Sequence, residues 1–497
     1  MSTPNAHQLT AEHTSRSYLI HLNLRSVLGV LMSSTILLLL LTNSTQLLDL
    51  DLKTACALLS ITSILVASIT ITLTPGNLWA PSSIYLAMLT LFHFGLALLF
   101  ALDSISDAMQ NIVARWFFGA HMPEALFVTA IGVASCALGI SIAGLFRRPE
   151  NTTNVGGNVL THDPNLDHYL SIIGSCMVVF AVIAWFLLVV LNGGFGLLIG
   201  SYGNYLTATA GAPMGYIWLL LGSGLAFLAA TITDRPSKAH IIAFAAFVVF
   251  ALFGLPLGLR GEVLFASLGA LVIRAKRGRR PSMSTTLVGV LVALVLISAI
   301  RELRQVGVSE AGTIAVDANV WDGVAELGAT LRPVVETINW NTGGTEGQNG
   351  ATYWAPIDRL FCRILPARDC VSASYDPRLL NVVVADRVGP IGFSPIAEAY
   401  ENFRVAGVFI VMLIIGSFVG FMNGWRPTTL NNAIAGVIMV ELLINVRNAF
   451  TALPTHLIFG FVCILAAVIL AKLFPLTTPR PRESNYYPPA SLMGSPK

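Results

Sequence analysis

The residues best suited to chemistry lie in one short stretch, GPIGFSPIAEAYENF, at residues 389–403. Ser394 fits the capping position of a helix and Pro395 its first turn, so a helix is predicted to begin there. Glu398 and Asn402, four residues apart, would share one face of that helix. A carboxylate held there can accept a hydrogen bond or a proton. The alternative is a solvated first turn whose acids complement the helix dipole.

A second candidate is the arginine of LPLGLRGEV, Arg260, which is followed by Glu262 and stands between glycines. Glycines let other groups approach the backbone closely. An arginine at the end of a membrane helix commonly extends its charged head into the lipid headgroup region. The other interpretation is a cation that lines a cavity at the outer leaflet. The sequence leaves both open.

Several other chemistries find no support in the sequence. It contains no phosphate-binding GxxxxGK[ST] loop, no HExxH, no CxxC pair and no GxSxG. The nine histidines show no metal-ligand spacing, so neither a metal nor a cofactor is expected. The Gly-rich stretch 193–213 carries Tyr202 and Tyr205, which fit a sugar-contacting or lid loop and equally an interfacial aromatic anchor.

The elements that must position these residues are membrane helices. Of the 497 residues, 55% are hydrophobic and 11% are charged, against about a quarter charged in soluble domains. The net charge of +3 is too small to predict a nucleic acid as partner. Residues 1–24 show no cleavable signal, so the first apolar run is interpreted as a retained helix. The predicted fold is an all-α polytopic membrane protein.

About twelve apolar runs are long enough to cross a bilayer. The seventh and eighth are short and close together, which is typical of a bent hairpin. The predicted spans are 27–45, 54–73, 82–101, 123–145, 169–192, 214–232, 240–256, 259–274, 284–301, 404–424, 428–446 and 454–474.

Basic residues gather in alternate connections, for example at Arg147, Arg148 and 274–280, and the positive-inside rule makes that face cytoplasmic. Both termini would then be cytoplasmic. The opposite short connections carry few basic residues, among them Arg260 and Arg447. The predicted organisation is an N-terminal transmembrane region of about nine spans (1–301), an extracytoplasmic segment (302–403), a C-terminal transmembrane region of about three spans (404–475) and a disordered cytoplasmic tail (476–497).

The outer segment is predicted to be partly ordered. Apolar residues three or four apart in 319–340 indicate an amphipathic helix with a break before Pro333. NVVVADRVGP, which precedes the stretch quoted above, is interpreted as a short strand or loop. Cys362 and Cys370 flank a short arm and would form a disulfide in an oxidising compartment. Two free thiols on a cytoplasmic loop are the competing interpretation.

The order of three pieces resembles the Wzy-type O-antigen polymerases, which join oligosaccharide repeat units. The pieces are GVAELGATLRPVVETI, GATYWAPIDRLFCRILP and GPIGFSPIAEAYENF, and they follow a many-span region with GLRGEVL in its middle. FSPIAEAYENF is the most specific, close to the family pattern Ser-x-Ile-Ala-Glu-Ala-Tyr-x-Asn-Phe. The sequence departs from the pattern at Arg404, where glycine is expected.

The resemblance implies a glycosyltransferase that moves a growing glycan from one undecaprenyl diphosphate onto a repeat unit on another, at the outer face of the bacterial inner membrane. It also implies a multi-span, GT-C-like glycosyltransferase fold, no nucleotide sugar, contact with membrane lipid, and a chain-length regulator and a flippase as partners.

Hypothetical roles follow for individual residues. Arg260 would bind the diphosphate, helped by Arg332 or Arg378, and Glu398 or Glu326 would orient or deprotonate the acceptor hydroxyl. Tyr353, Tyr400 and Asn402 would hydrogen-bond sugar. Two alternatives remain open, a flippase or transporter of lipid-linked glycan and an O-antigen ligase.

Overall fold

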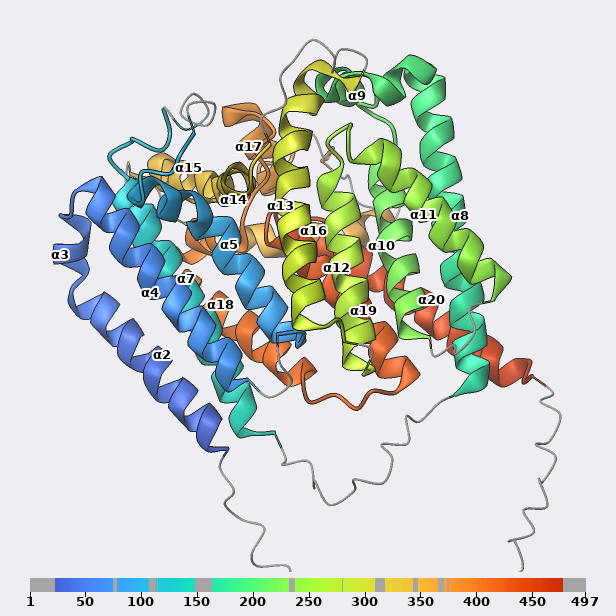
Figure 1. The fold of residues 1–497 in the computed structure, drawn as a ribbon, viewed down its shortest axis with the longest axis horizontal. Helices are drawn as coiled ribbons and strands as arrows, with labels where there is room; N and C mark the ends of the chain where they lie inside the picture. Colours follow the sequence, from blue (N-terminus) through green and yellow to red (C-terminus); the bar gives the residue numbers. More distant parts are fainter. Residues whose placement is uncertain are drawn as a thin grey trace, which may run out of the picture.

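The computed structural model describes residues 23–476 with gaps, and every regular element in the described part of the chain is helical (Figure 1). The prediction of an all-α protein is confirmed. The gaps within 23–476 are 75–77, 107–112, 114, 148–162, 232–236, 279, 309–317, 343–346, 365–370 and 373–374.

Each of the twelve predicted spans coincides with a helix. Eight helices are long and apolar enough to cross a bilayer, and they are α2 (Leu24–Thr42), α4 (Leu52–Leu73), α5 (Pro81–Ala101), α7 (Met122–Leu145), α8 (Pro164–Gly193), α13 (Met283–Val306), α18 (Pro395–Met422) and α20 (Leu453–Leu473). The other four have 17 residues each, and they are α10 (Met214–Ala230), α11 (Lys238–Gly254), α12 (Arg260–Lys276) and α19 (Thr429–Asn445). Since about 20 residues are needed to cross, the total of twelve stays a prediction.

Helix α7 lies at the centre of one half of the molecule and packs along α18. It is apolar all round and almost completely buried, as expected of a helix surrounded by other helices. The two backbones approach closely because small residues face each other. A Cβ at Gly139 would meet the carbonyl oxygen of Leu413, and one at Gly416 would meet that of Cys136.

Helix α18 begins as the sequence predicts and then breaks. The side chain of Ser394 accepts a hydrogen bond from the amide of Ile396, and Pro395 stands in the first turn. Non-helical backbone at Phe403 and Arg404 separates the first two turns from the long apolar part, at the predicted start of that span. Residues 395–402 therefore form a short anchor ahead of the span.

The segment between α13 and α18 forms the short helices α14 (Val320–Gly328), α15 (Arg332–Asn341), α16 (Ala351–Ile364) and α17 (Leu380–Val388). A 3-10 turn at Ala329–Leu331 makes the predicted break before Pro333. The strand or loop predicted for NVVVADRVGP is wrong, because its first residues belong to α17. Leu380 and Val384, one turn apart, are both buried, and this helical packing outweighs the β preference of the valines.

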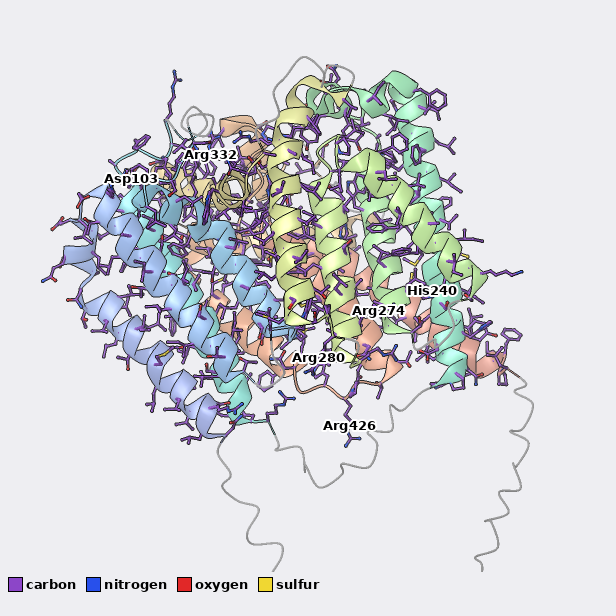
Figure 2. The ribbon with its side chains drawn as sticks, in the orientation of Figure 1. Asp103, His240, Arg274, Arg280, Arg332 and Arg426 are labelled. Atoms are coloured by element: carbon purple, nitrogen blue, oxygen red, sulfur yellow. The ribbon has the colours of Figure 1, made fainter. Side chains whose placement is uncertain are left out.

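Charged residues lie at both ends of the molecule (Figure 2). Arg274, Arg280 and Arg426 lie at the end where α2 begins and α20 ends, whereas Arg332 and Asp103 lie at the opposite end with α14 and α15. Which of the two ends faces the cytoplasm stays a prediction. Arg148 lies outside the described residues.

Candidate functional site

A cavity of about 500 Å³ lies beside the segment that precedes α18. Its walls come from α10, α12, α13, α17, α19, α20 and the short helix α9 (Tyr202–Ala208), together with the connections 389–393 and 447–452. Its polar lining includes Tyr202, Arg260, Glu262, Arg304, Glu441, Arg447 and His456. Three arginines therefore converge on one pocket from three separate elements.

Arg260 is the first residue of α12 and is only 3% exposed. The preceding Gly258 has φ +92, a conformation that favours glycine, and a Cβ there would press on Arg304 and Tyr202. The Nη2 of Arg260 donates to a carboxylate oxygen of Glu326 in α14. Its Nη1 is buried and has no hydrogen-bond partner among the described residues. A buried guanidinium nitrogen without a partner is costly, and a ligand oxygen in the cavity would satisfy it.

Arg304 and Arg447 complete the cationic lining. The guanidinium of Arg304 stands 5.6 Å from the centroid of the Tyr202 ring. Burial, followed by the charge of Arg260, lowers the pKa of Arg447 to about 10 and also lowers the pKa of Arg304. Both stay charged at neutral pH, so their mutual repulsion favours an anion between them.

Glu326 neutralises Arg260 from outside the cavity. Burial alone would raise its pKa, yet the charge and hydrogen bond of Arg260 outweigh burial and leave the pKa below its ordinary value. Glu326 is thus an ionised partner that fixes the orientation of Arg260. The structure places it with Arg260, as expected, but it does not line the pocket.

The connection that carries Arg447 is held by the stretch that drew attention in the sequence. The amide of Phe393 donates to the carbonyl oxygen of Arg447 at 2.9 Å. Glu398 accepts a hydrogen bond from the amide of Phe450 at 2.7 Å and another from the hydroxyl of Thr352 at 2.9 Å. Residues 389–393, the first third of this stretch, therefore line the cavity, and Glu398 anchors the loop beside it.

Comparison with known proteins agrees with this architecture. The family model for the O-antigen polysaccharide polymerase Wzy matches residues 27–477, most of the chain. The chain belongs to this Wzy family. It is therefore an integral membrane protein of a polysaccharide polymerase family. The resemblance seen in the sequence is confirmed.

Two further comparisons complete the relationship of this Wzy-family chain. It is 28% identical to Protein CapE of Staphylococcus aureus over 267 residues, which are 53% of this chain and 58% of CapE. The chain thus matches a little over half the length of that relative. No solved structure matches it.

Three predicted sugar-binding residues of the Wzy chain lie outside the cavity. Asn402 donates to the hydroxyl of Thr352 at 2.6 Å and accepts from the amide of Gly350 at 2.9 Å, so it fixes the start of α16. The hydroxyl of Tyr400 donates to Glu124 of α7 at 3.1 Å. The ring of Tyr353 packs edge-on against Phe450, and its pKa is raised by burial. Their assignment to sugar stays a prediction.

The two arginines predicted to help bind the diphosphate, Arg332 and Arg378, both form ion pairs with carboxylates. Arg332 pairs with Glu336 on its own helix at 3.2 Å. Arg378 pairs with Asp376 at 3.0 Å and Asp358 at 3.2 Å. Neither lines the cavity of the Wzy protein.

Of the two tyrosines in the Gly-rich stretch, Tyr202 lines the cavity. Tyr205 is buried outside the cavity lining, and its hydroxyl accepts a hydrogen bond from the Trp185 indole at 3.2 Å. Cys362 is disulfide-bonded. Its predicted partner, Cys370, lies outside the described residues.

The sequence did not single out Arg304, Glu441 or His456 as site residues, and it used Arg447 only to assign sidedness. The sequence nevertheless contains features that could have identified three of these residues. Arg447 is one of few basic residues in the short connections predicted to face outward. Glu441 and His456 are ionisable residues inside predicted spans, which membrane proteins rarely tolerate without a function.

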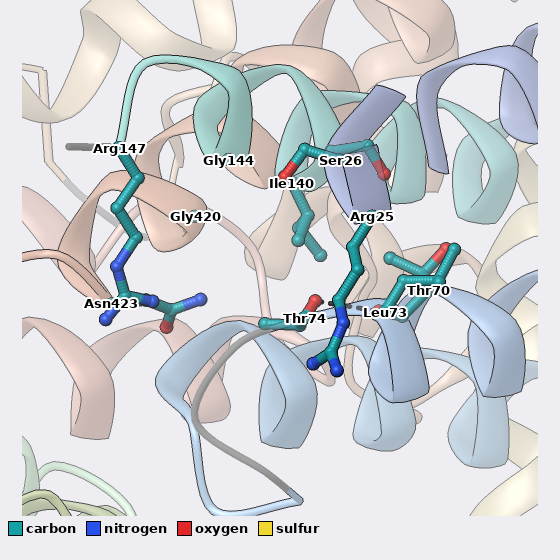
Figure 3. Close-up of a pocket in the computed structure, with 11 residues that line it drawn as sticks. Arg25, Ser26, Thr70, Leu73, Thr74, Ile140, Gly144, Arg147, Gly420 and Asn423 are labelled. Carbon is teal, nitrogen blue, oxygen red and sulfur yellow. Dashed lines mark hydrogen bonds between the residues drawn. The ribbon is translucent and has the colours of Figure 1, made fainter. Parts of the chain in front are cut away.

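A second, smaller cavity lies at the other end of the molecule (Figure 3). Arg25 and Arg147 flank it, with Ser26, Thr70 and Asn423 nearby. Its volume is about 20 Å³, enough for a single water. It cannot hold a sugar, so of these two cavities only the larger one is a candidate site.

Proposed function

We propose that this protein polymerises oligosaccharide repeat units carried on undecaprenyl diphosphate. A growing glycan leaves one carrier and joins the non-reducing end of the repeat unit on another, at the outer face of the bacterial inner membrane. Family membership supports the polymerase reaction, and the cluster of arginines supports a lipid diphosphate as the leaving group.

The chemistry explains why arginines are needed. The bond from the anomeric carbon to the diphosphate oxygen breaks, and negative charge develops on the departing diphosphate. Preorganised cations in a water-poor site stabilise that charge better than bulk water does. Guanidinium groups also match the geometry of phosphate oxygens.

The Nη1 of Arg260, which is buried and has no partner in the part of the chain that the structure describes, is the observation that carries the proposal. Pairing with Glu326 uses only Nη2 of Arg260. It does not explain why Nη1 is buried beside a cavity large enough for a sugar. Arg260 would hold the diphosphate together with Arg304 and Arg447, and Tyr202 would flank the sugar. Tyrosine rings commonly supply an apolar face together with a hydroxyl.

The decisive experiment is extension in detergent. Purified protein is incubated with one lipid-linked repeat unit, and the products are separated by size. A ladder of lipid-linked oligomers is expected. Because detergent leaves no bilayer to cross, a flippase would give no ladder. A ligase would give product only when a lipid core acceptor is added. Either of those results would overturn the proposal.

Location is tested separately with two cysteine variants at opposite ends of the molecule. Asp103→Cys and Arg426→Cys place thiols at the exposed positions labelled in Figure 2. An impermeant maleimide added to intact cells with a permeable outer membrane should label the first variant only. Labelling of the second alone would invert the proposed orientation.

A further inference from the structure

A histidine and a glutamate share the candidate cavity with the arginines. His456, in the first turn of α20, and Glu441, near the end of α19, both line it. The Nδ1 of His456 lies 2.9 Å from Oε2 of Glu441. The histidine side chain is 13% exposed and the glutamate side chain 4% exposed.

We propose that His456 is the general base of glycan transfer, and that Glu441 is a positioning residue that orients its imidazole. The proposal rests on the polymerase function proposed above and adds the group that activates the acceptor. The cavity-lining side chains assign this role to the pair, in place of the two carboxylates expected from the sequence.

The contact with Glu441 determines which nitrogen can act. An ionised carboxylate only accepts hydrogen bonds, so Nδ1 must carry the proton and donate it to Oε2. The lone pair of the neutral ring is then on Nε2. That nitrogen makes no hydrogen bond within the described part of the chain, and it belongs to a side chain that lines the cavity. A carboxylate placed this way also stabilises the imidazolium that forms.

The step balances without any further reactant. The acceptor hydroxyl oxygen attacks the anomeric carbon of the donor sugar, and a new carbon–oxygen bond forms. The bond from that carbon to the diphosphate oxygen breaks, and its electron pair leaves with the lipid diphosphate beside the arginines. The hydroxyl proton passes to Nε2 of His456, which later returns it to water. General base catalysis of this kind typically contributes about 100- to 10,000-fold in rate.

The expected acids are less well placed for this step. Glu326 is paired with Arg260, and Glu398 accepts hydrogen bonds from Thr352 and Phe450. Neither lines the cavity. Glu262 does line it and is the competing base. The titratable and charged groups that face the same cavity are Tyr202, Arg260, Glu262, Arg304, Glu441 and Arg447.

A purely structural contact between α19 and α20 is the other competing explanation, and His456→Asn separates the two. The asparagine amide can occupy the position of Nδ1 and still donate to Glu441, but nothing replaces Nε2. We expect unchanged protein level and unchanged retention of the lipid-linked donor. Transfer should fall by roughly 100-fold or more. Wild-type transfer by His456→Asn would overturn the proposal.

Two further readouts separate catalysis from packing. In His456→Ala, added imidazole should restore part of the transfer rate, because the cavity can admit a free ring. The pH profile of wild-type transfer should also have a limb at acid pH, which should be absent in His456→Asn and kept in Glu262→Gln. Loss of the limb in Glu262→Gln alone would assign the base to Glu262 and overturn the role of His456.

These outcomes are distinguishable from failure of the proposed function. If wild-type protein makes no ladder from a lipid-linked repeat unit, the polymerase proposal fails and the base assignment fails with it. If the wild type makes a ladder and His456→Asn makes the same one, only the base assignment fails.

Discussion

Arg260, at the start of α12, and Glu326, in α14, form a buried ion pair that joins the membrane helices to the segment between α13 and α18, the predicted outer segment. The pair is nine-tenths or more buried on both sides. An arginine at the N-terminal end of a helix is disfavoured by the helix dipole, so the carboxylate offsets that cost and the cost of burial. The outer segment therefore contributes directly to the cationic site by fixing one of its arginines.

Removing Glu326 should both destabilise the protein and misplace Arg260. Breaking a buried pair from one side leaves an uncompensated charge and costs about 3–5 kcal/mol. We expect Glu326→Ala to lower the thermal midpoint in detergent and to abolish polymer.

The matched control for that experiment is Glu336→Ala, which removes the partner of Arg332, whose side chain is 32% exposed. Its cost should stay within about 1 kcal/mol. Equal destabilisation by the two variants would contradict the importance of the buried pair.

Arg447 should be needed for turnover and dispensable for folding. Its side chain lines the cavity, whereas its structural contact with Phe393 uses the backbone carbonyl, which any residue provides. Arg447→Ala should leave the membrane level of the protein unchanged and reduce polymer by at least about 100-fold, the loss typical of removing one charge-stabilising donor. Arg447→Lys keeps the positive charge, so it should give more polymer than Arg447→Ala and less than the wild type.

Arg332→Ala is the control for Arg447, because Arg332 has the same charge and does not line the cavity. It should give a normal length distribution of polymer on a sizing gel. Equal losses in both variants would indicate a general effect of positive charge.

Glu398 should act through structure. Its two acceptor contacts tie Phe450 and Thr352 together and so hold the connection that carries Arg447. In Glu398→Gln one acceptor oxygen becomes a donor, and each lost buried hydrogen bond costs about 1–3 kcal/mol. We expect a lower thermal midpoint and a partial loss of polymer that lower growth temperature restores. Unchanged stability with complete loss of transfer would instead support the base role predicted from the sequence.

Much of the fold could be predicted from the sequence, because the signals that start, continue and end a helix are local. Apolar runs, the Ser394 cap and the break before Pro333 depend on neighbours within a few residues, and each appears where predicted. The valine-rich run at α17 was misjudged, since burial against distant residues outweighed its β preference.

The site was harder to predict because its polar members come from five helices and one connection. Arg260 and Tyr202 were found from glycine and aromatic patterns, yet no spacing links Arg304 to Arg447 or Glu441 to His456. Conversely, Glu398 and Asn402 share a helix face as predicted, but that face contacts α16 and the loop at Phe450. Periodicity indicates which side chains point together, not what they meet.

Acid should weaken the outer segment at Asp376. Hydrogen bonds from Arg378 hold the pKa of this carboxyl below its ordinary value of 3.8, against the opposing effect of burial. A lowered folded-state pKa contributes stability that is present above the unfolded value and is lost as pH falls through the folded one. The difference in thermal midpoint between wild type and Asp376→Asn should therefore be large at pH 7 and shrink below about pH 4.

Asp103→Asn supplies the control for the acid effect. Asp103 pairs with Lys53 at the surface, where both side chains are more than half exposed. Such pairs contribute little, so this variant should differ little from wild type at either pH. A difference for Asp376→Asn that did not change with pH would contradict the assignment.

Arg404 should be strained at its backbone, and the strain can be measured by comparing two substitutions. Its φ of 59 and ψ of −150 fall in a region that essentially only glycine adopts, at the position where the resemblance leads us to expect glycine. Arg404→Ala and Arg404→Gly both remove the side chain, including its stacking over the Tyr400 ring. Only glycine relieves the backbone, so Arg404→Gly should be more stable than Arg404→Ala by about 1–3 kcal/mol in reversible unfolding. Equal stabilities of the two variants would mean that the backbone at residue 404 is not strained. The break in α18 would then not require glycine.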